Sequence, residues 1–100
     1  MCGIAGILTK PTLDITNLSK KIDLSLIGHR GPDKLAEESF GPMWLGHTRL
    51  SILDLSEAGN QPMISKSGRF VIAFNGEVYN HLELRKSFLP NFDFKGHSDT

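Results

Sequence analysis

Residues 43–53 read MWLGHTRLSIL, and their alternation predicts a β-strand near the middle of the chain. Successive side chains of a strand point to opposite faces of its sheet. Trp44 and Thr48 therefore share one face with the apolar positions 50 and 52, whereas His47 and Arg49 share the other face with position 51. We expect a strand with one mainly apolar face and one face that carries a histidine and an arginine.

Further strands are predicted on both sides of this stretch. Residues 2–8 (CGIAGIL) are short, apolar and interrupted by glycine, which is typical of a buried strand. Residues 70–74 (FVIAF) are apolar on both faces, as expected inside a core of stacked sheets. Shorter strands are predicted at 77–79 (EVY) and around Phe92 and Phe94, which alternate with charged residues.

Residues 14–27 (DITNLSKKIDLSLI) show the periodicity of a helix. Their apolar residues recur at spacings of three and four, namely Ile15, Leu18, Ile22 and Leu26. Asp14 or Thr16 is expected as the N-cap, and Gly28 follows the expected end of the helix. The pattern predicts one helix that packs a single face against the core.

A second helix (HLELRKSFL) is predicted after Asn80, where Glu83 stands at the spacing of a capping box and Pro90 ends the helix. Loops are predicted at 29–33 (HRGPD) and 57–62 (EAGNQP), because glycine, proline and asparagine favour turns. Strands that are joined by turns as well as by helices indicate an α+β fold class rather than a regular series of β-α-β units.

The composition is that of a globular chain, with 39% hydrophobic and 22% charged residues among 100. The formal net charge of 0 gives no sign of a nucleic acid partner. The longest apolar runs are far shorter than the roughly 20 residues of a membrane-spanning helix, and no basic segment precedes the apolar N-terminus, as a signal peptide requires. We therefore expect a cytoplasmic protein with no membrane partner. Residues 96–100 contain no terminating helix, which suggests a truncated sequence.

Cys2 is the only cysteine, so the chain can form no internal disulfide and offers no second thiol for a zinc site. A lone cysteine is commonly a small buried apolar residue. Its position behind Met1 allows another interpretation, because removal of Met1 would expose an α-amine on the residue that carries the thiol. The α-amine of a peptide ordinarily has a pKa of about 7.7–8.0. Cys2 would then combine a nucleophile and its base.

Two polar features later in the chain also have two interpretations. Asn75-Gly76 is a strong signal for a type I′ hairpin turn. The same pair could supply an amide side chain and a backbone N–H to an oxyanion hole. Arg49 could be a solvated arginine on a half-exposed strand, or it could bind a carboxylate through two parallel hydrogen bonds.

Glu77 and Asp99 are surface acids in the simpler interpretation, but near a pocket the pair could bind an ammonium group. His29 and His47 could suggest a Cys–His pair, yet we expect structural roles for both, since neither has a ligand or nucleophile at a suitable spacing. A nucleophile with its own base, two oxyanion donors, an arginine and two acids suit hydrolysis of the side-chain amide of an α-amino acid. L-glutamine is the obvious substrate.

Several segments in a row resemble one protein family. They are MCGIAGI, HRGPD, GHTRLSILDLS, NQPM, FNGEVYN and HSDT. They are collinear and cover nearly the whole chain, which resembles the N-terminal glutaminase domain of glutamine-dependent asparagine synthetases, a class II amidotransferase of the Ntn-hydrolase type. MCGI and NG alone would fit the wider amidotransferase group, whereas HRGPD, RLSILDLS with QPM, and NGEVYN are similar to the asparagine synthetase branch.

The resemblance implies a role for each candidate residue. Cys2, freed of Met1, would attack the side-chain carbonyl of glutamine while its own amine relays the proton. The Asn75 side chain and the Gly76 N–H would hold the oxyanion. Arg49 would bind the α-carboxylate of glutamine, and the two acids would bind its α-amino group. A γ-glutamyl thioester would form, ammonia would leave and water would release glutamate.

The resemblance also implies a longer protein. The family's glutaminase domain is a four-layer α/β/β/α sandwich of mainly antiparallel sheets, of which residues 1–100 would be the N-terminal portion. The glutaminase part would need no cofactor or metal. ATP and Mg²⁺ would serve a C-terminal synthetase domain, absent from this sequence, in which the ammonia amidates aspartate. Two alternatives stay open: a non-catalytic truncated module of the same fold, and an amidotransferase with a different acceptor.

Overall fold

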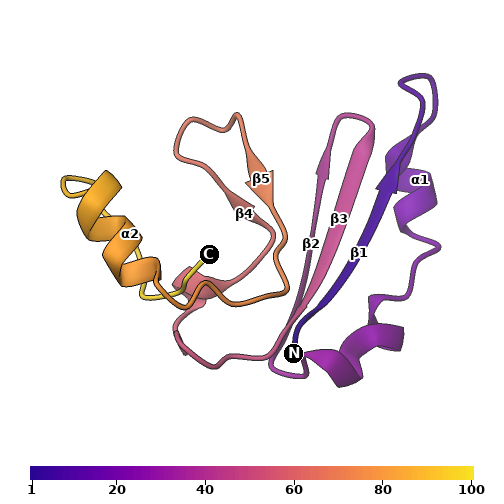
Figure 1. The fold of residues 1–100 in the computed structure, drawn as a ribbon. Helices are drawn as coiled ribbons and strands as arrows, with labels where there is room; N and C mark the ends of the chain where they lie inside the picture. Colours follow the sequence, from indigo (N-terminus) through magenta and orange to yellow (C-terminus); the bar gives the residue numbers. More distant parts are fainter.

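The computed structural model describes residues 1–100 and contains two separate antiparallel sheets. The first sheet has three strands in the order β1-β3-β2, so the stretch that begins at Met43 forms its central strand (Figure 1). The second sheet pairs β4 with β5. The strands are β1 (Gly3–Leu8), β2 (Lys34–Phe40), β3 (Met43–Arg49), β4 (Met63–Ile64) and β5 (Val71–Ile72).

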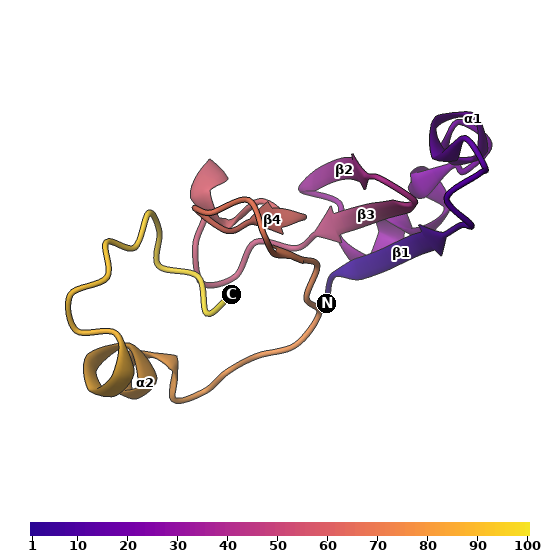
Figure 2. The same cartoon turned by 90° about the horizontal axis from the view of Figure 1, so that it is seen from above.

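Four helical segments accompany the strands. They are α1 (Ile15–Ser19), the 3₁₀ helix η1 (Leu24–Arg30), the 3₁₀ turn η2 (Glu57–Gly59) and α2 (His81–Phe88). α1 and η1 lie beside the three-stranded sheet, whereas α2 lies beyond the small β4-β5 sheet (Figure 1; Figure 2). This mixture of helices and antiparallel sheets is compatible with the predicted α+β class. None of the helices has the length and apolar character that a membrane crossing requires.

The single helix predicted over residues 14–27 is wrong, because the segment forms two shorter helices. Asp14 caps α1 as predicted, since its carboxylate accepts a 2.9 Å hydrogen bond from the N–H of Thr16. Asp23 then adopts an extended conformation and accepts a 3.0 Å bond from the N–H of Ser25, which starts η1. Aspartate favours helix starts over helix interiors, so the second aspartate interrupts the helix that the apolar spacing predicts.

The buried core lies between the three-stranded sheet and the two helices beside it. Trp44 is only 1% exposed and packs with Ile15 and Leu24. Gly46 lies two residues further along the same face of β3. A Cβ atom there would lie 2.7 Å from the Trp44 ring and 2.9 Å from Leu24. The central strand is therefore packed against the helices without room for another methyl group.

The sequence predicts two of the three strands of the first sheet. The strand predicted over 2–8 is confirmed as β1. β3 follows the prediction up to Arg49 but ends there, and residues 50–53 form no strand. β2 has no counterpart in the sequence analysis, because it is an edge strand with mostly exposed and often charged side chains (KLAEESF). Edge strands commonly carry such charges, which oppose pairing with other chains.

The strands predicted in the second half are shorter or absent. β5 covers two residues of the predicted 70–74, and its Ile72 side chain is exposed rather than enclosed by a second sheet. The strand predicted at 77–79 is wrong, as is the strand predicted around Phe92 and Phe94. These two rings instead contact each other edge to face, with centroids 4.8 Å apart. Aromatic contacts between near neighbours can therefore mimic the alternation of a strand.

α2 confirms the helix predicted after Asn80, and it ends before Pro90 as expected. The predicted capping box is absent, because the side chain of Asn80 makes no hydrogen bond to the first turn. The backbone of Asn80 has φ −101° and ψ 25°, which is not the extended conformation of a capping residue. Gly28 lies inside η1, which continues to Arg30, so the predicted end at Gly28 is also wrong.

We predict that Gly46→Ala destabilises the packing on β3. The added methyl group would overlap Trp44 and Leu24, and overpacking of this kind lowers the free energy of unfolding by about 1–3 kcal/mol. Gly28→Ala is the matched control, since no atom lies within 4 Å of the position that its Cβ would take. Thermal and urea unfolding measure both variants. Equal stability of the two would contradict the close packing described for β3.

Candidate functional site

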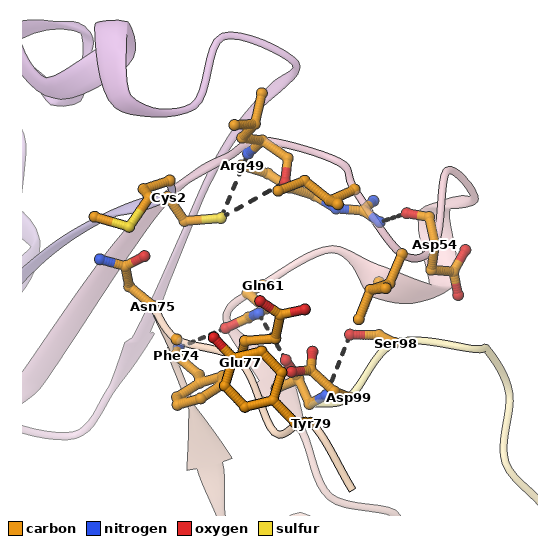
Figure 3. Close-up of a pocket in the computed structure, with 17 residues that line it drawn as sticks. Cys2, Arg49, Asp54, Gln61, Phe74, Asn75, Glu77, Tyr79, Ser98 and Asp99 are labelled. Atoms are coloured by element: carbon orange, nitrogen blue, oxygen red, sulfur yellow. Dashed lines mark hydrogen bonds between the residues drawn. The ribbon is translucent and has the colours of Figure 1, made fainter. Parts of the chain in front are cut away.

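A cavity of about 310 Å³ lies where four segments meet: the start of β1, the loop after β3, the segment after β5 and residues 98–100 (Figure 3). Six residues selected from the sequence all line it: Cys2, Arg49, Asn75, Gly76, Glu77 and Asp99. Cys2 and Arg49 lie on one side, and Asn75, Glu77 and Asp99 lie on the other. The structure thus brings the six residues together, while the roles given to them stay predictions.

Hydrogen bonds to the thiol of Cys2 and to the next residue hold Cys2 at the cavity. Its Sγ accepts a hydrogen bond from the N–H of Leu50 at 3.4 Å. The next residue, Gly3, donates a 3.1 Å bond from its N–H to the hydroxyl of Thr48. A Cβ atom on Gly3 would lie 2.6 Å from that hydroxyl oxygen. Glycine at position 3 therefore lets the strand that carries the thiol approach β3 closely.

The HRGPD segment supports both Cys2 and the loop after β3. Arg30 donates a 3.1 Å bond from Nε to the carbonyl of Cys2. The Asp33 carboxylate accepts a 2.7 Å bond from the N–H of Ser51, and its own N–H donates to the carbonyl of Arg49 at 3.0 Å. Between them, a Cβ atom on Gly31 would overlap the backbone of β3. This loop therefore positions two parts of the cavity wall.

Arg49 is a buried cation whose hydrogen-bond partners are neutral. Only 7% of the residue is exposed. Its Nη1 donates to the carbonyl of Ser56 and to Oδ1 of Asn60, both at 2.7 Å, and its Nη2 donates to the carbonyl of Asp54. A Cβ atom on Gly59 would overlap the guanidinium. The loop after β3 therefore wraps around a positive charge that no carboxylate oxygen binds directly.

Asp54 connects this loop to His97 through hydrogen bonds. One carboxylate oxygen accepts bonds from the N–H and the hydroxyl of Ser56, at 2.8 and 2.6 Å, and the other accepts a 2.7 Å bond from the N–H of His97. These hydrogen bonds, first that from the Ser56 side chain, hold the pKa of the carboxyl well below its usual range, and the charge of Arg49 adds a smaller effect. Asp54 is therefore ionised near neutral pH.

Asn75 and Gly76 do not form the type I′ turn that the sequence allows. β5 ends at Ile72, and no paired strand follows. A type I′ turn needs positive φ at both central residues, whereas only Gly41 and Gly68 have positive φ in this structure. The pair is exposed at the cavity instead. An amide side chain and a glycine N–H are thus available to a ligand.

His47 lies behind this segment rather than beside the thiol. It is 1% exposed, and its Nε2 lies 3.3 Å from the carbonyl of Phe74. Burial is the main cause that lowers its pKa, although the bond to Phe74 acts in the opposite direction. A neutral His47 therefore donates from Nε2 to that carbonyl. His29 is exposed, and neither histidine lines the cavity.

The two acids differ in how firmly they are held. Asp99 is partly buried, and one of its carboxylate oxygens accepts a 2.6 Å bond from the N–H of Val78. Glu77 is exposed at the rim, as is the neighbouring Tyr79. Arg49 lies on the opposite side of the cavity from these two acids (Figure 3). Asp54 lies beside Arg49, but its carboxylate is already bound by Ser56 and His97. This arrangement is complementary to a small zwitterion, with a thiol at hand as nucleophile.

Four supporting residues were not assigned any role from the sequence. Arg30, Asp54 and Gln61 belong to the segments HRGPD, RLSILDLS and NQPM, so the motifs were noticed without the contacts of their side chains. Tyr79 belongs to the segment FNGEVYN and lines the cavity. For Arg30, Asp54 and Gln61 the type of residue gives no signal, because each binds the backbone of a segment distant in sequence.

All of the chain, residues 1–100, matches the sequence model of a family described as "Glutamine amidotransferase domain". The chain is 38% identical over 100 residues to a glutamine-hydrolysing asparagine synthetase 1 of Lotus japonicus, over 99% of this chain and 17% of the relative. It is 38% identical over 100 residues to asparagine synthetase B of Escherichia coli, over 99% and 18%. "Amidase chyE" of Penicillium rubens is 36% identical over 110 residues, covering 99% and 16%. The chain spans less than a fifth of the length of these curated relatives.

We predict that the Asp54 carboxylate stabilises its loop in a pH-dependent way. Because its pKa is lower in the folded than in the unfolded state, the stabilisation is complete above the unfolded pKa of about 4 and is lost as the pH falls towards the folded pKa. Hydrogen-exchange protection factors of the Ser56 and His97 amides should therefore be lower at pH 2 than at pH 7, with the fall lying below about pH 4. Asp54→Asn should reduce them at pH 7 and weaken their dependence on pH.

The control for this experiment is Asp93→Asn, since Asp93 is exposed and takes part in none of the hydrogen bonds of Asp54. It should leave the protection of both amides unchanged at either pH. Protection that is equal in the wild type and in Asp54→Asn at pH 7 would rule out the stabilising role of the carboxylate.

Proposed function

Since the chain belongs to the glutamine amidotransferase family, we propose that it hydrolyses the side-chain amide of L-glutamine as the glutaminase part of an asparagine synthetase-like protein. One observation carries the proposal: a single cavity gathers a thiol, a buried guanidinium and, on the side opposite the guanidinium, the carboxylates of Glu77 and Asp99. An α-amino acid has the complementary pair of charges, and the thiol is a nucleophile for its side-chain amide.

The substrate is oriented by its two charged groups. Arg49 binds the α-carboxylate, because a guanidinium has five N–H donors and the loop uses three of them here. The remaining N–H groups, on Nε and Nη2, suit a carboxylate with two oxygens. Glu77 and Asp99 bind the α-ammonium group from the opposite side. One oxygen of Asp99 is already fixed by Val78, which keeps this carboxylate in place before the substrate arrives.

The reaction starts at Cys2 after Met1 has been removed. The free α-amine of Cys2 accepts the thiol proton, and the sulfur attacks the side-chain carbonyl carbon of glutamine. The side-chain N–H of Asn75 and the backbone N–H of Gly76 stabilise the negative charge on the carbonyl oxygen. The C–N bond breaks as the amine passes its proton to the leaving ammonia, and a γ-glutamyl thioester remains. Water then hydrolyses the thioester to glutamate and restores the thiol.

The rest of the proposal concerns the longer protein. Residues 1–100 are the N-terminal portion of a four-layer α/β/β/α glutaminase domain, and a synthetase domain that uses ATP and Mg²⁺ passes the ammonia to aspartate. The names of the Lotus and Escherichia relatives and the small share of their length that is matched support this reading. A second candidate is an amidotransferase with another acceptor. The relative "Amidase chyE" shows that similar chains are not all named asparagine synthetases.

We predict that the complete protein carries Cys2 as its N-terminal residue and releases glutamate from glutamine. The glutamine analogue 6-diazo-5-oxo-L-norleucine should label Cys2 with one equivalent, because the analogue carries the same α-amino acid group and an electrophile at the side-chain carbonyl. Intact-mass and peptide mass spectrometry would measure both the loss of Met1 and the label. Cys2→Ala should abolish the label and reduce glutamate release to background.

A non-catalytic module would give a different result. Retained Met1 together with no glutamate release would favour that alternative, and an unlabelled protein that already begins at Cys2 would remove the catalytic assignment of the thiol. If the same protein forms asparagine from aspartate and ATP, the acceptor is aspartate. If it releases glutamate but forms no asparagine, another acceptor is favoured.

We predict that Arg49→Lys raises KM for glutamine by about 10- to 100-fold, since a charge-assisted hydrogen bond contributes about 1.5–3 kcal/mol and lysine cannot form the paired contact. The matched control is Arg69→Lys, because Arg69 is exposed and stacks on Phe70 away from the cavity. The comparison substrate is 4-aminobutanamide, which is glutamine without its α-carboxylate. If Arg49→Lys impaired both substrates equally, Arg49 would be a structural residue and not the carboxylate ligand.

A further inference from the structure

Gln61 is a buried residue of the cavity wall with no part in the proposed chemistry. It is 6% exposed, and both ends of its side chain are hydrogen bonded. Oε1 accepts a 2.6 Å bond from the N–H of Phe74, and Nε2 donates a 3.2 Å bond to the hydroxyl of Thr100. The side chain therefore joins two segments of the cavity that are distant in sequence (Figure 3).

The bond to Phe74 takes the place of a missing pair in the β4-β5 sheet. The strands are antiparallel, with Met63 opposite Ile72. Continuing this register by two residues puts Gln61 opposite Phe74. The ladder does not reach that point, because β4 begins at Met63. The side-chain oxygen of Gln61 accepts the hydrogen bond that the sheet no longer provides.

Phe74 is held at its carbonyl as well as at its N–H. The buried His47 binds the carbonyl oxygen through Nε2 at 3.3 Å. Both backbone polar groups of the residue directly before Asn75-Gly76 are thus fixed by buried side chains. The course of the chain after β5 depends on these two bonds, since residues 73–76 belong to no strand.

The second bond of Gln61 ends beside the proposed ammonium ligand. Thr100 directly follows Asp99, and Asp99 accepts the N–H of Val78 at 2.6 Å. The segment after β5 and residues 98–100 are therefore tied together at two points, once by Gln61 and once by Asp99. A shift of Gln61 would change the position of the oxyanion donors and of the ammonium ligand together.

We infer that Gln61 is a positioning residue of the glutaminase site, which sets the oxyanion donors Asn75-Gly76 through Phe74 and sets Asp99 through Thr100. This inference rests on the proposed function. Gln61→Leu would leave the N–H of Phe74 without its acceptor, and an unsatisfied buried donor moves or recruits water. Because small misplacements of catalytic groups can reduce rates by about 100-fold, Gln61→Leu should lower kcat for glutamine by about 10- to 100-fold.

A merely structural role of Gln61 predicts a different pattern of effects. Alkylation of Cys2 by iodoacetamide displaces iodide directly and forms no oxyanion, so it reports the exposure and reactivity of the thiol alone. In the complete protein, Gln61→Leu should keep this alkylation rate within about twofold of the wild type while glutamine hydrolysis falls. General loosening of the fold would change both rates in parallel.

Two variants separate the two hydrogen bonds of Gln61. Gln61→Glu keeps an acceptor for the N–H of Phe74 and can accept the hydroxyl of Thr100, so it should restore most of the kcat lost in Gln61→Leu. Thr100→Val removes only the second bond. It should raise KM by about 2- to 10-fold, as expected for one neutral hydrogen bond, with kcat changed by less than about threefold.

Leu24→Ala is the control for lost stability, because Leu24 is buried in the core cluster with Trp44 and does not line the cavity. Wild-type kcat in Gln61→Leu would overturn the positioning role, and so would a fall in alkylation that matches the fall in hydrolysis. A wild-type protein that releases no glutamate would instead overturn the proposed function itself, together with the inference built on it. Activity in the wild type with unchanged activity in Gln61→Leu overturns the inference alone.

Discussion

The burial of one positive charge at the end of the central strand organises the part of the molecule that forms the cavity. Arg49 is the last residue of β3, and the guanidinium is enclosed by backbone carbonyls of residues 54 and 56 and by the side chain of Asn60. A buried cation is unfavourable unless its N–H groups are bound. The loop after β3 therefore has to curl back on the strand, and Gly59 allows the close approach.

The same constraint explains why polar contacts, rather than the apolar core, position the site. The buried apolar cluster contains Ile15, Leu24 and Trp44 and lies on the far side of the first sheet. Around the cavity, the fixed points are bonds from side chains to backbone: Arg30 to Cys2, Asp54 to His97 and Gln61 to Phe74. Such bonds are directional and sensitive to the loss of one partner. Precision at the site therefore depends on a few polar side chains.

The sequence predicts the elements that carry their own local signal. β1, β3 and α2 were found from alternation, apolar character and a terminal proline, and the family resemblance is confirmed over the whole chain. The edge strand β2 was missed because its exposed, charged side chains resemble a loop. The helix over 14–27 was misjudged because apolar spacing does not register a second aspartate cap at Asp23. Local patterns thus fail where an element is polar or is interrupted.

For the site, the sequence singled out six residues that the structure brings to one cavity, and it missed residues that hold their backbone. Cys2 and Arg49 stand out as a lone thiol and a charge inside a strand, which single-residue chemistry can recognise. Asp54 and Gln61 bind backbone groups at positions 97 and 74. No residue type or spacing encodes such long-range contacts, because they exist only once the chain has folded. The sequence therefore shows which side chains are able to react, but it does not show which contacts hold them in place.

The two sheets share no hydrogen-bonded ladder, so the cavity has two separately built halves. The first half carries the thiol of Cys2, directly before β1, and Arg49 at the end of β3, and the second carries Asn75, Glu77 and Asp99 on irregular backbone (Figure 3). A bound α-amino acid would bridge the halves through its two charged groups. It would thus add contacts between two halves that few hydrogen bonds connect. Under the proposed function, the separation between Arg49 and the acids would have to match the length of the substrate. The side chains of Asp54 and His47 connect the two halves and so influence this separation.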